Sequence, residues 1–92
     1  MLFVTHYQLV GKRSKKRVSE LMALFGERGP GPGTIAHYVY ADGGGGFVIS
    51  DDSGLTRLYE DALSYSPYMS FETRPLLTID EAVPSIGEWM SS

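Results

Sequence analysis

Polar and aromatic side chains of the kinds that bind small ligands recur at alternating positions in several stretches of the chain. They comprise an imidazole, an amide, two phenols, a hydroxyl and a carboxylate–guanidinium pair: His6, Gln8, Tyr38, Tyr40, Ser50, Glu72 and Arg74. On one face of a sheet, this set would line a cavity that binds a small molecule. Alternatively, the set forms a dimer interface, where tyrosine and arginine are common. Glu72 and Arg74, two residues apart, can also simply pair with each other.

A second candidate site is the basic run KRSKKR. Five of the eight basic residues lie within six positions: Lys12, Arg13, Lys15, Lys16 and Arg17. The other 86 residues hold three bases and all 11 acids, a net charge of −8. This distribution argues against nucleic acid, because phosphate binding needs cations spread along one face. The run is either a solvated first turn of a helix or a docking patch for an acidic protein partner. We expect these five side chains to lie outside the apolar stripe of a helix, so that neutral replacements preserve the fold.

Residue types that other chemistries need are missing or poorly spaced. Cysteine is absent and the two histidines stand among scattered acids, so no metal site is expected. The chain has no G-x-S-x-G motif and no pair of carboxylates at a convincing spacing. We therefore expect no catalytic residue, no metal and no cofactor.

Two further features favour structural interpretations. The glycine run of residues 42–46 opens a strand rather than a helix, so it predicts a hairpin turn in preference to a phosphate loop. Its four glycines exceed what a tight turn needs, which suits mobility or the close approach of a partner. His37 stands among apolar residues, which favours a hydrogen-bonded core residue over a base or a ligand.

The elements that must position these residues follow from hydrophobic periodicity and from glycine, proline and capping signals. We predict strands at residues 1–10, 34–40, 47–50 and 69–77. Helices are predicted at residues 14–26, at residues 55–62, and from a capping box at Thr78 and Glu81, the last interrupted or restarted at Pro84. This order is that of a single-domain α+β protein (residues 1–92) with the ferredoxin-like β-α-β-β-α-β fold and a short C-terminal helix.

Side-chain alternation assigns the two faces of the expected sheet. A glycine turn with Tyr40 opposite Gly46 sets Val39 opposite Phe47. The helices are then expected to cover Phe3, Thr5, Tyr7, Leu9, Ile35, His37, Val39, Phe47, Ile49, Phe71 and Thr73. In particular, Phe47, Val39 and Ile49 should be buried beneath Leu21, Phe25, Leu58 and Tyr59. The candidate ligand residues, with Val4 and Val48, share the uncovered face, called the open face below, and its apolar side chains predict a dimer through the sheet.

Four segments carry a resemblance to a known family: MLFVTHY, the H-Y hairpin with its glycine turn, GFVISDDSG and FETRPLL. Over nearly its whole length, the chain resembles a family of short uncharacterised proteins from actinobacteria and their phages. The resemblance implies the dimeric α+β barrel form of the ferredoxin-like fold. It implies no established activity, since better-known dimeric α+β barrels include cofactor-free monooxygenases, isomerases and haem enzymes. Ser50 departs from the family pattern, in which an acidic residue is expected.

Together these features predict a small non-catalytic homodimer that binds another macromolecule, a host protein if the chain comes from a phage. The alternative is a small-molecule-binding dimeric α+β barrel enzyme, such as a cofactor-independent monooxygenase or isomerase, that uses the open face. The first ten residues alternate like a strand without a basic leader, and apolar runs of four or five residues are too short to span a membrane. We therefore expect a cytoplasmic protein.

Overall fold

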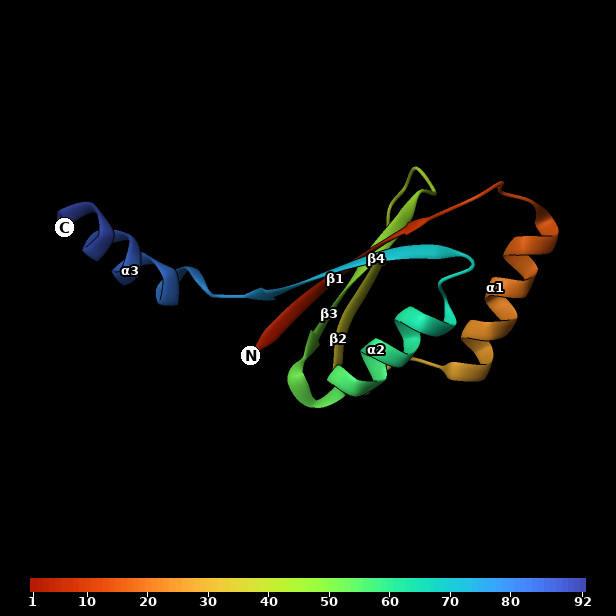
Figure 1. Ribbon diagram of the computed structural model, residues 1–92, viewed down its shortest axis with the longest axis horizontal. Helices are drawn as coiled ribbons and strands as arrows, with labels where there is room; N and C mark the ends of the chain where they lie inside the picture. Colours follow the sequence, from red (N-terminus) through yellow and green to blue (C-terminus); the bar gives the residue numbers. More distant parts are fainter.

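Four antiparallel strands form one sheet in the computed structural model, which describes residues 1–92. The strands are β1 (Leu2–Leu9), β2 (Thr34–Val39), β3 (Gly45–Asp51) and β4 (Met69–Leu76), in the spatial order β2-β3-β1-β4. Helix α1 (Lys15–Arg28) follows β1 and helix α2 (Leu55–Ser64) follows β3. Both helices lie on the same side of the sheet (Figure 1). The predicted α+β fold with ferredoxin-like element order is thus confirmed.

Local signals explain where α1 and α2 begin. The Ser14 side chain caps α1 by accepting a hydrogen bond from the backbone N–H of Arg17 at 3.2 Å. The helix runs past the predicted end at Gly26 and ends at Arg28. Gly29 follows as its C-cap, and its φ of 68° favours glycine. A short 3-10 turn, Asp52–Gly54, precedes α2. Asp51 caps this turn by accepting hydrogen bonds from the Ser53 hydroxyl and N–H, which lower the pKa of Asp51.

A polar network joins the end of α1 to α2. Asp61 Oδ1 accepts hydrogen bonds from Arg28 Nε at 2.6 Å and from Arg57 Nε at 3.0 Å. The guanidinium of Arg57 also donates to the backbone carbonyls of Arg28 and Gly29. The carboxylate raises the pKa of Arg28, chiefly through its hydrogen bond. The carboxylate of Asp61 and the guanidinium groups of Arg28 and Arg57 are thus paired with one another and link the two helices.

The β2–β3 hairpin has a register one residue away from the predicted one. The Tyr40 N–H donates to the Gly45 carbonyl at 2.8 Å, so the turn closes one residue earlier than expected. Tyr38 therefore pairs with Phe47, and Val39 pairs with Gly46. Because a one-residue shift moves every side chain of a strand to the opposite face, Phe47 and Ile49 lie on the open face and not beneath the helices. Val48 and Ser50, predicted on the open face, lie on the helix side for the same reason.

The predicted faces of β1 and β4 are confirmed. On the helix side, the hydroxyls of Thr5 and Thr73 lie 2.9 Å apart, and the rings of Tyr7 and Phe71 have centroids 6.4 Å apart. On the open face, His6 of β1 lies directly opposite Glu72 of β4. The two strands therefore position the predicted ligand residues of β1 and β4 on the same surface.

The interior of a single chain is small. Five of the 92 residues are buried: Thr5, Gly45, Gly46, Tyr65 and Met69. Val39 on the edge strand, predicted to be buried, is 74% exposed. Tyr59 on α2, predicted to cover it, is itself 68% exposed. Ile35, also predicted beneath the helices, lies at an irregularity in the β2–β3 pairing and is 60% exposed. The burial that stabilises most domains is thus largely missing from one chain.

Helix α3 (Ile79–Ser91) stands apart from the sheet and the other two helices (Figure 1). The predicted capping box is present: Thr78 Oγ accepts from the Glu81 N–H at 3.1 Å, and the Glu81 carboxylate accepts from the Thr78 N–H at 3.0 Å. These hydrogen bonds lower the pKa of Glu81. The predicted interruption at Pro84 is wrong, since the helix continues through the proline, which has no N–H to donate to the preceding turn. None of the three helices combines the length and the hydrophobicity that a membrane-spanning segment requires.

Candidate ligand-binding site on the open face

A cluster of aromatic rings centred on Phe47 occupies the open face. β3 carries Phe47 at the point where its direct neighbours across the sheet are His6 on β1 and Tyr38 on β2. The ring centroids of His6, Tyr38 and Tyr40 lie 5.9, 5.5 and 6.1 Å from that of Phe47. At such spacings aromatic rings attract one another, and their exposed faces form a platform for another planar group.

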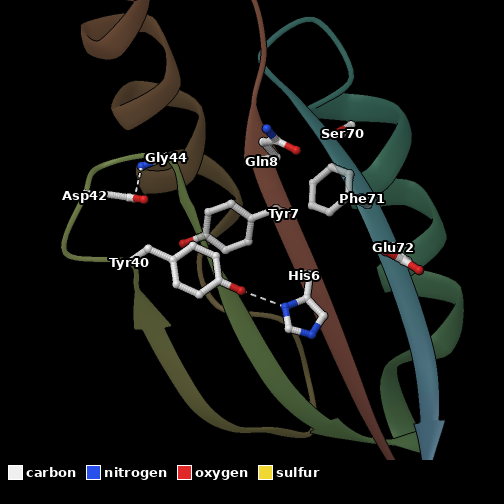
Figure 2. A pocket seen from close by; sticks show the side chains of 9 residues that line it. All are labelled: His6, Tyr7, Gln8, Tyr40, Asp42, Gly44, Ser70, Phe71 and Glu72. Atoms are coloured by element: carbon white, nitrogen blue, oxygen red, sulfur yellow. Dashed lines mark hydrogen bonds between the residues drawn. The ribbon is translucent and has the colours of Figure 1, made fainter.

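His6 is held in place by Tyr40, which follows the end of β2. The Tyr40 hydroxyl lies 2.7 Å from Nδ1 of His6 (Figure 2). When the phenol donates this hydrogen bond, the neutral imidazole carries its proton on Nε2. This orientation leaves His6 Nε2–H free to donate to a ligand on the open face.

A hollow of about 590 Å³ opens beside His6 at the end of the sheet where the β2–β3 turn lies. Residues of β1, of β4 and of the β2–β3 turn line it (Figure 2): His6, Gln8, Tyr40, Asp42, Gly44, Ser70 and Glu72. Tyr7 and Phe71, whose rings lie on the helix side of the sheet, complete the lining. The turn is ordered by Asp42, whose Oδ1 accepts a hydrogen bond from the Gly44 N–H at 2.8 Å. The hollow thus combines rings with hydroxyl, amide, imidazole and carboxylate groups, as ligand sites do.

Glu72 and Arg74 form an ion pair on the open face. Arg74 Nε donates to Glu72 Oε1 at 3.0 Å, and a second guanidinium nitrogen donates to the same oxygen. The hydrogen bond with Arg74 and its positive charge lower the pKa of Glu72. The carboxylate is therefore ionised at neutral pH, which suits it to accept hydrogen bonds and not to donate a proton.

The structure brings together most of the predicted ligand residues. His6, Gln8, Tyr40 and Glu72 line the hollow, while Tyr38 contacts Phe47 and Arg74 pairs with Glu72. Ser50 takes no part, because the hairpin register turns it to the helix side. Sequence reasoning missed Phe47 in the ring cluster and five residues that line the hollow: Tyr7, Asp42, Gly44, Ser70 and Phe71. A four-residue loop counted from the Ala-Asp-Gly turn signal would have placed Phe47 on the open face.

The second histidine belongs to the other side of the sheet. His37 Nε2 lies 2.6 Å from the Tyr7 hydroxyl, and its ring centroid lies 6.3 Å from that of Phe25 on α1. Burial and the nearby Tyr40 raise the pKa of Tyr7, so its phenol stays protonated and can donate this hydrogen bond. His37 is hydrogen-bonded as predicted, yet its side chain is exposed and its predicted neighbours Phe47 and Ile49 lie on the open face.

One protein family matches almost the whole chain. The family model for a domain of unknown function, DUF3303, matches residues 1–89, which include the whole sheet and every residue of the open face. The chain belongs to the DUF3303 family. No curated protein matches it. The predicted membership of an uncharacterised family is thus confirmed, while the source of the chain stays a prediction.

The five basic residues of the run KRSKKR differ in their contacts in this DUF3303 protein. Arg17 is a structural residue: its guanidinium donates to the carbonyls of Val10 at 3.2 Å and Pro67 at 2.7 Å, and lies 5.6 Å from the centre of the Tyr68 ring. Arg13 lies beside the glycine turn, where a Cβ on Gly43 would be 2.9 Å from its Nη1. None of the four ion pairs of the chain involves Lys12, Lys15 or Lys16.

Replacing Arg17 by glutamine should lower the free energy of unfolding of the DUF3303 protein by about 2 kcal/mol, because it removes two charge-assisted hydrogen bonds. These contacts argue against the expectation that all five basic side chains can be neutralised without harm to the fold. Lys16→Gln, one residue earlier, is the matched control and should change stability by less than about 0.5 kcal/mol. Urea denaturation followed by circular dichroism measures both values. Equal stability of the two variants would show that the Arg17 contacts do not hold the fold.

Proposed function

We propose that this protein is a non-catalytic homodimer whose open sheet faces meet and enclose a binding site for a small planar molecule. The observation that carries the proposal is the uncovered ring cluster, in which Phe47 stands at the centre and Tyr40 orients His6. Rings and an oriented hydrogen-bond donor are the groups that hold a planar ligand in place.

The second copy supplies the cover that one chain lacks. Neither α1 nor α2 lies over Tyr38, Phe47 or Ile49, because both helices pack on the other side of the sheet. A monomer seldom leaves such a contiguous apolar surface in water. Two sheets facing each other remove these side chains from solvent and convert the hollow beside His6 into an enclosed cavity.

The size and lining of the hollow indicate what it can hold. Its volume of about 590 Å³ lies within the range of sites for small organic ligands, about 300–1,000 Å³. Tyr40 in the lining, with the ring of Phe47 next to it, favours a flat, partly apolar ligand. When Tyr40 donates to Nδ1 of His6, the free Nε2–H favours a ligand that carries an acceptor oxygen or nitrogen. The Glu72 carboxylate can accept a hydrogen bond from a donor group of the same molecule.

The protonation state of Glu72 and the hydrogen bond of His6 favour a binding role over a catalytic one. Arg74 lowers the pKa of Glu72, which makes the carboxylate a weaker general base, and its ionised form is a poor general acid at neutral pH. One nitrogen of His6 is already occupied by Tyr40. These two observations favour a carrier or sensor of a small molecule over the monooxygenase or isomerase considered from the sequence.

A second candidate function is the docking of an acidic protein, which the unpaired Lys12, Lys15 and Lys16 favour. Lys15 and Lys16 belong to the first turn of α1 and Lys12 precedes it, and α1 lies on the side of the sheet opposite to the open face. Replacing all three by glutamine should weaken such docking and leave small-molecule binding unchanged.

Ligand-observed NMR with a library of aromatic fragments tests the proposed site. Fragments that bind the wild type should bind His6→Ala about tenfold more weakly and Tyr40→Phe about fivefold more weakly, because each change removes an oriented hydrogen bond. Tyr59→Phe is the matched control, since Tyr59 lies on α2 and its hydroxyl has no partner in the site. Fragments whose affinity is the same for wild type, His6→Ala and Tyr40→Phe would overturn the proposal.

A further inference from the structure

Helix α3 is amphipathic and has no partner within its own chain. The apolar side chains gather on one face, within an arc of about 120° at 100° per residue: Ile79, Ala82, Val83, Ile86, Trp89 and Met90. The opposite face carries Asp80, Glu81, Ser85 and Glu88. Trp89 is 76% exposed, and every side-chain hydrogen bond of α3 is local to residues 78–92. A helix with this pattern is stable in water only when its apolar face packs against something.

The dimensions of the chain support the same conclusion. The radius of gyration is 16.3 Å, against about 12 Å for a compact chain of this length. The accessible surface is 6712 Å², about 1,400 Å² above the roughly 5,300 Å² typical of a folded monomer of this mass. A stable protein–protein interface needs about 800 Å² from each partner. The excess surface of one chain is therefore enough to build such an interface.

The charge of α3 narrows the choice of partner. The helix has three acidic residues and no basic residue. Helices that lie on membranes carry lysine and arginine on their polar face to contact anionic lipids, so α3 is unsuited to that role. A protein surface with exposed apolar side chains is the remaining kind of partner, and the chain itself provides one.

Edge strand β2 offers the matching surface. Its outer edge is unpaired, and two of its apolar side chains, Ile35 and Val39, are largely exposed. Sheets commonly protect such an edge by covering it with a helix. β2 and β4 lie at opposite edges of the sheet, so a two-fold axis parallel to the strands places each β4 over the β2 of the other copy when the open faces meet. The α3 that continues from β4 then reaches the start of that β2.

We propose that α3 crosses to a second copy of this chain and packs its apolar face beside Ile35 at the exposed edge of β2. This proposal rests on the homodimer proposed above. The exchange is reciprocal, as closed two-fold assemblies require, and it covers in each copy both the stripe of α3 and the edge of the sheet.

Trp89 is the single tryptophan of the chain, so its fluorescence reports on α3 directly. Emission should be blue-shifted in the dimer and should move to the wavelength of exposed tryptophan as dilution yields monomers, with sedimentation giving the mass at each concentration. Ile86→Lys and Ile35→Lys should each raise the dimer dissociation constant about tenfold or more, because each places a charge in an apolar contact. Ser85→Lys adds the same charge to the polar face of α3 and should change the constant less than about twofold.

Each alternative gives a different result. A dimer with exposed Trp89 at every concentration, or with Ile86→Lys equal to Ser85→Lys, would overturn the exchange and leave the homodimer standing. A blue-shifted Trp89 in a monomer would mean that α3 folds onto its own sheet, and would also overturn it. An exposed Trp89 in a chain that remains monomeric would remove both the exchange and the homodimer.

Discussion

Gly46→Ala should destabilise the fold by about 3 kcal/mol, a large share of the stability of so small a protein. Gly46 lies in β3 between β1 and β2 and is buried. A Cβ at this position would collide with the Tyr38 carbonyl and lie 2.5 Å from the hydroxyl oxygen of Tyr7. The Tyr38 carbonyl cannot move away without breaking the hydrogen bonds between β2 and β3, so the added methyl group has no room.

Gly26→Ala is the matched control for this prediction. Gly26 lies within α1, and nothing would come within 4 Å of an added Cβ. Alanine is the better helix former, so the same substitution should raise stability by up to about 1 kcal/mol. Thermal and urea denaturation give both values. A Gly46→Ala variant as stable as the wild type would contradict the close approach of the Tyr7 side chain to Gly46 of β3.

The glycine run thus has two roles, and only one of them was predicted from the sequence. Its first part forms the hairpin turn, where Gly43 has a φ of 78°. Its second part, Gly45 and Gly46, belongs to β3 and lets Tyr7 and the β1 backbone come close. Composition predicts a turn, whereas the division of four identical residues between turn and strand depends on contacts with β1, which lies far away in the sequence.

The same limit explains which parts of the site were predictable. Alternation within β1 and β4 correctly placed His6, Gln8, Glu72 and Arg74, because each strand is regular along its whole length. The hairpin required a residue count through the turn, and an error of one residue exchanged Phe47 and Ile49 for Val48 and Ser50. The centre of the ring cluster was therefore missed, although its surroundings were found.

The detachment of α3 could not be predicted at all. Its capping box and its apolar periodicity are plain in the sequence, and both are present in the structure. Periodicity shows that a helix has an apolar face but not which surface covers it. The distance of α3 from the rest of the chain became visible only in three dimensions.

Phe47→Lys should abolish the dimer while leaving the folded chain intact. In one chain the Phe47 side chain is half-buried on the open face, so the charged end of a lysine can reach water and stability should fall by about 1 kcal/mol or less. In the dimer the same charge would be enclosed between two sheets, which should weaken association about a hundredfold or more. Had Phe47 been a core residue, as the sequence suggested, its replacement would instead unfold the protein. Circular dichroism separates these two outcomes.

Sedimentation equilibrium of the wild type beside Phe47→Lys, at the same micromolar concentration, tests the pairing of the open faces most directly. We predict about 20 kDa for the wild type, twice the 10.1 kDa of one chain, and 10.1 kDa for a folded Phe47→Lys. A wild type of 10.1 kDa, or a Phe47→Lys variant that remains dimeric, would contradict an interface formed by the open face.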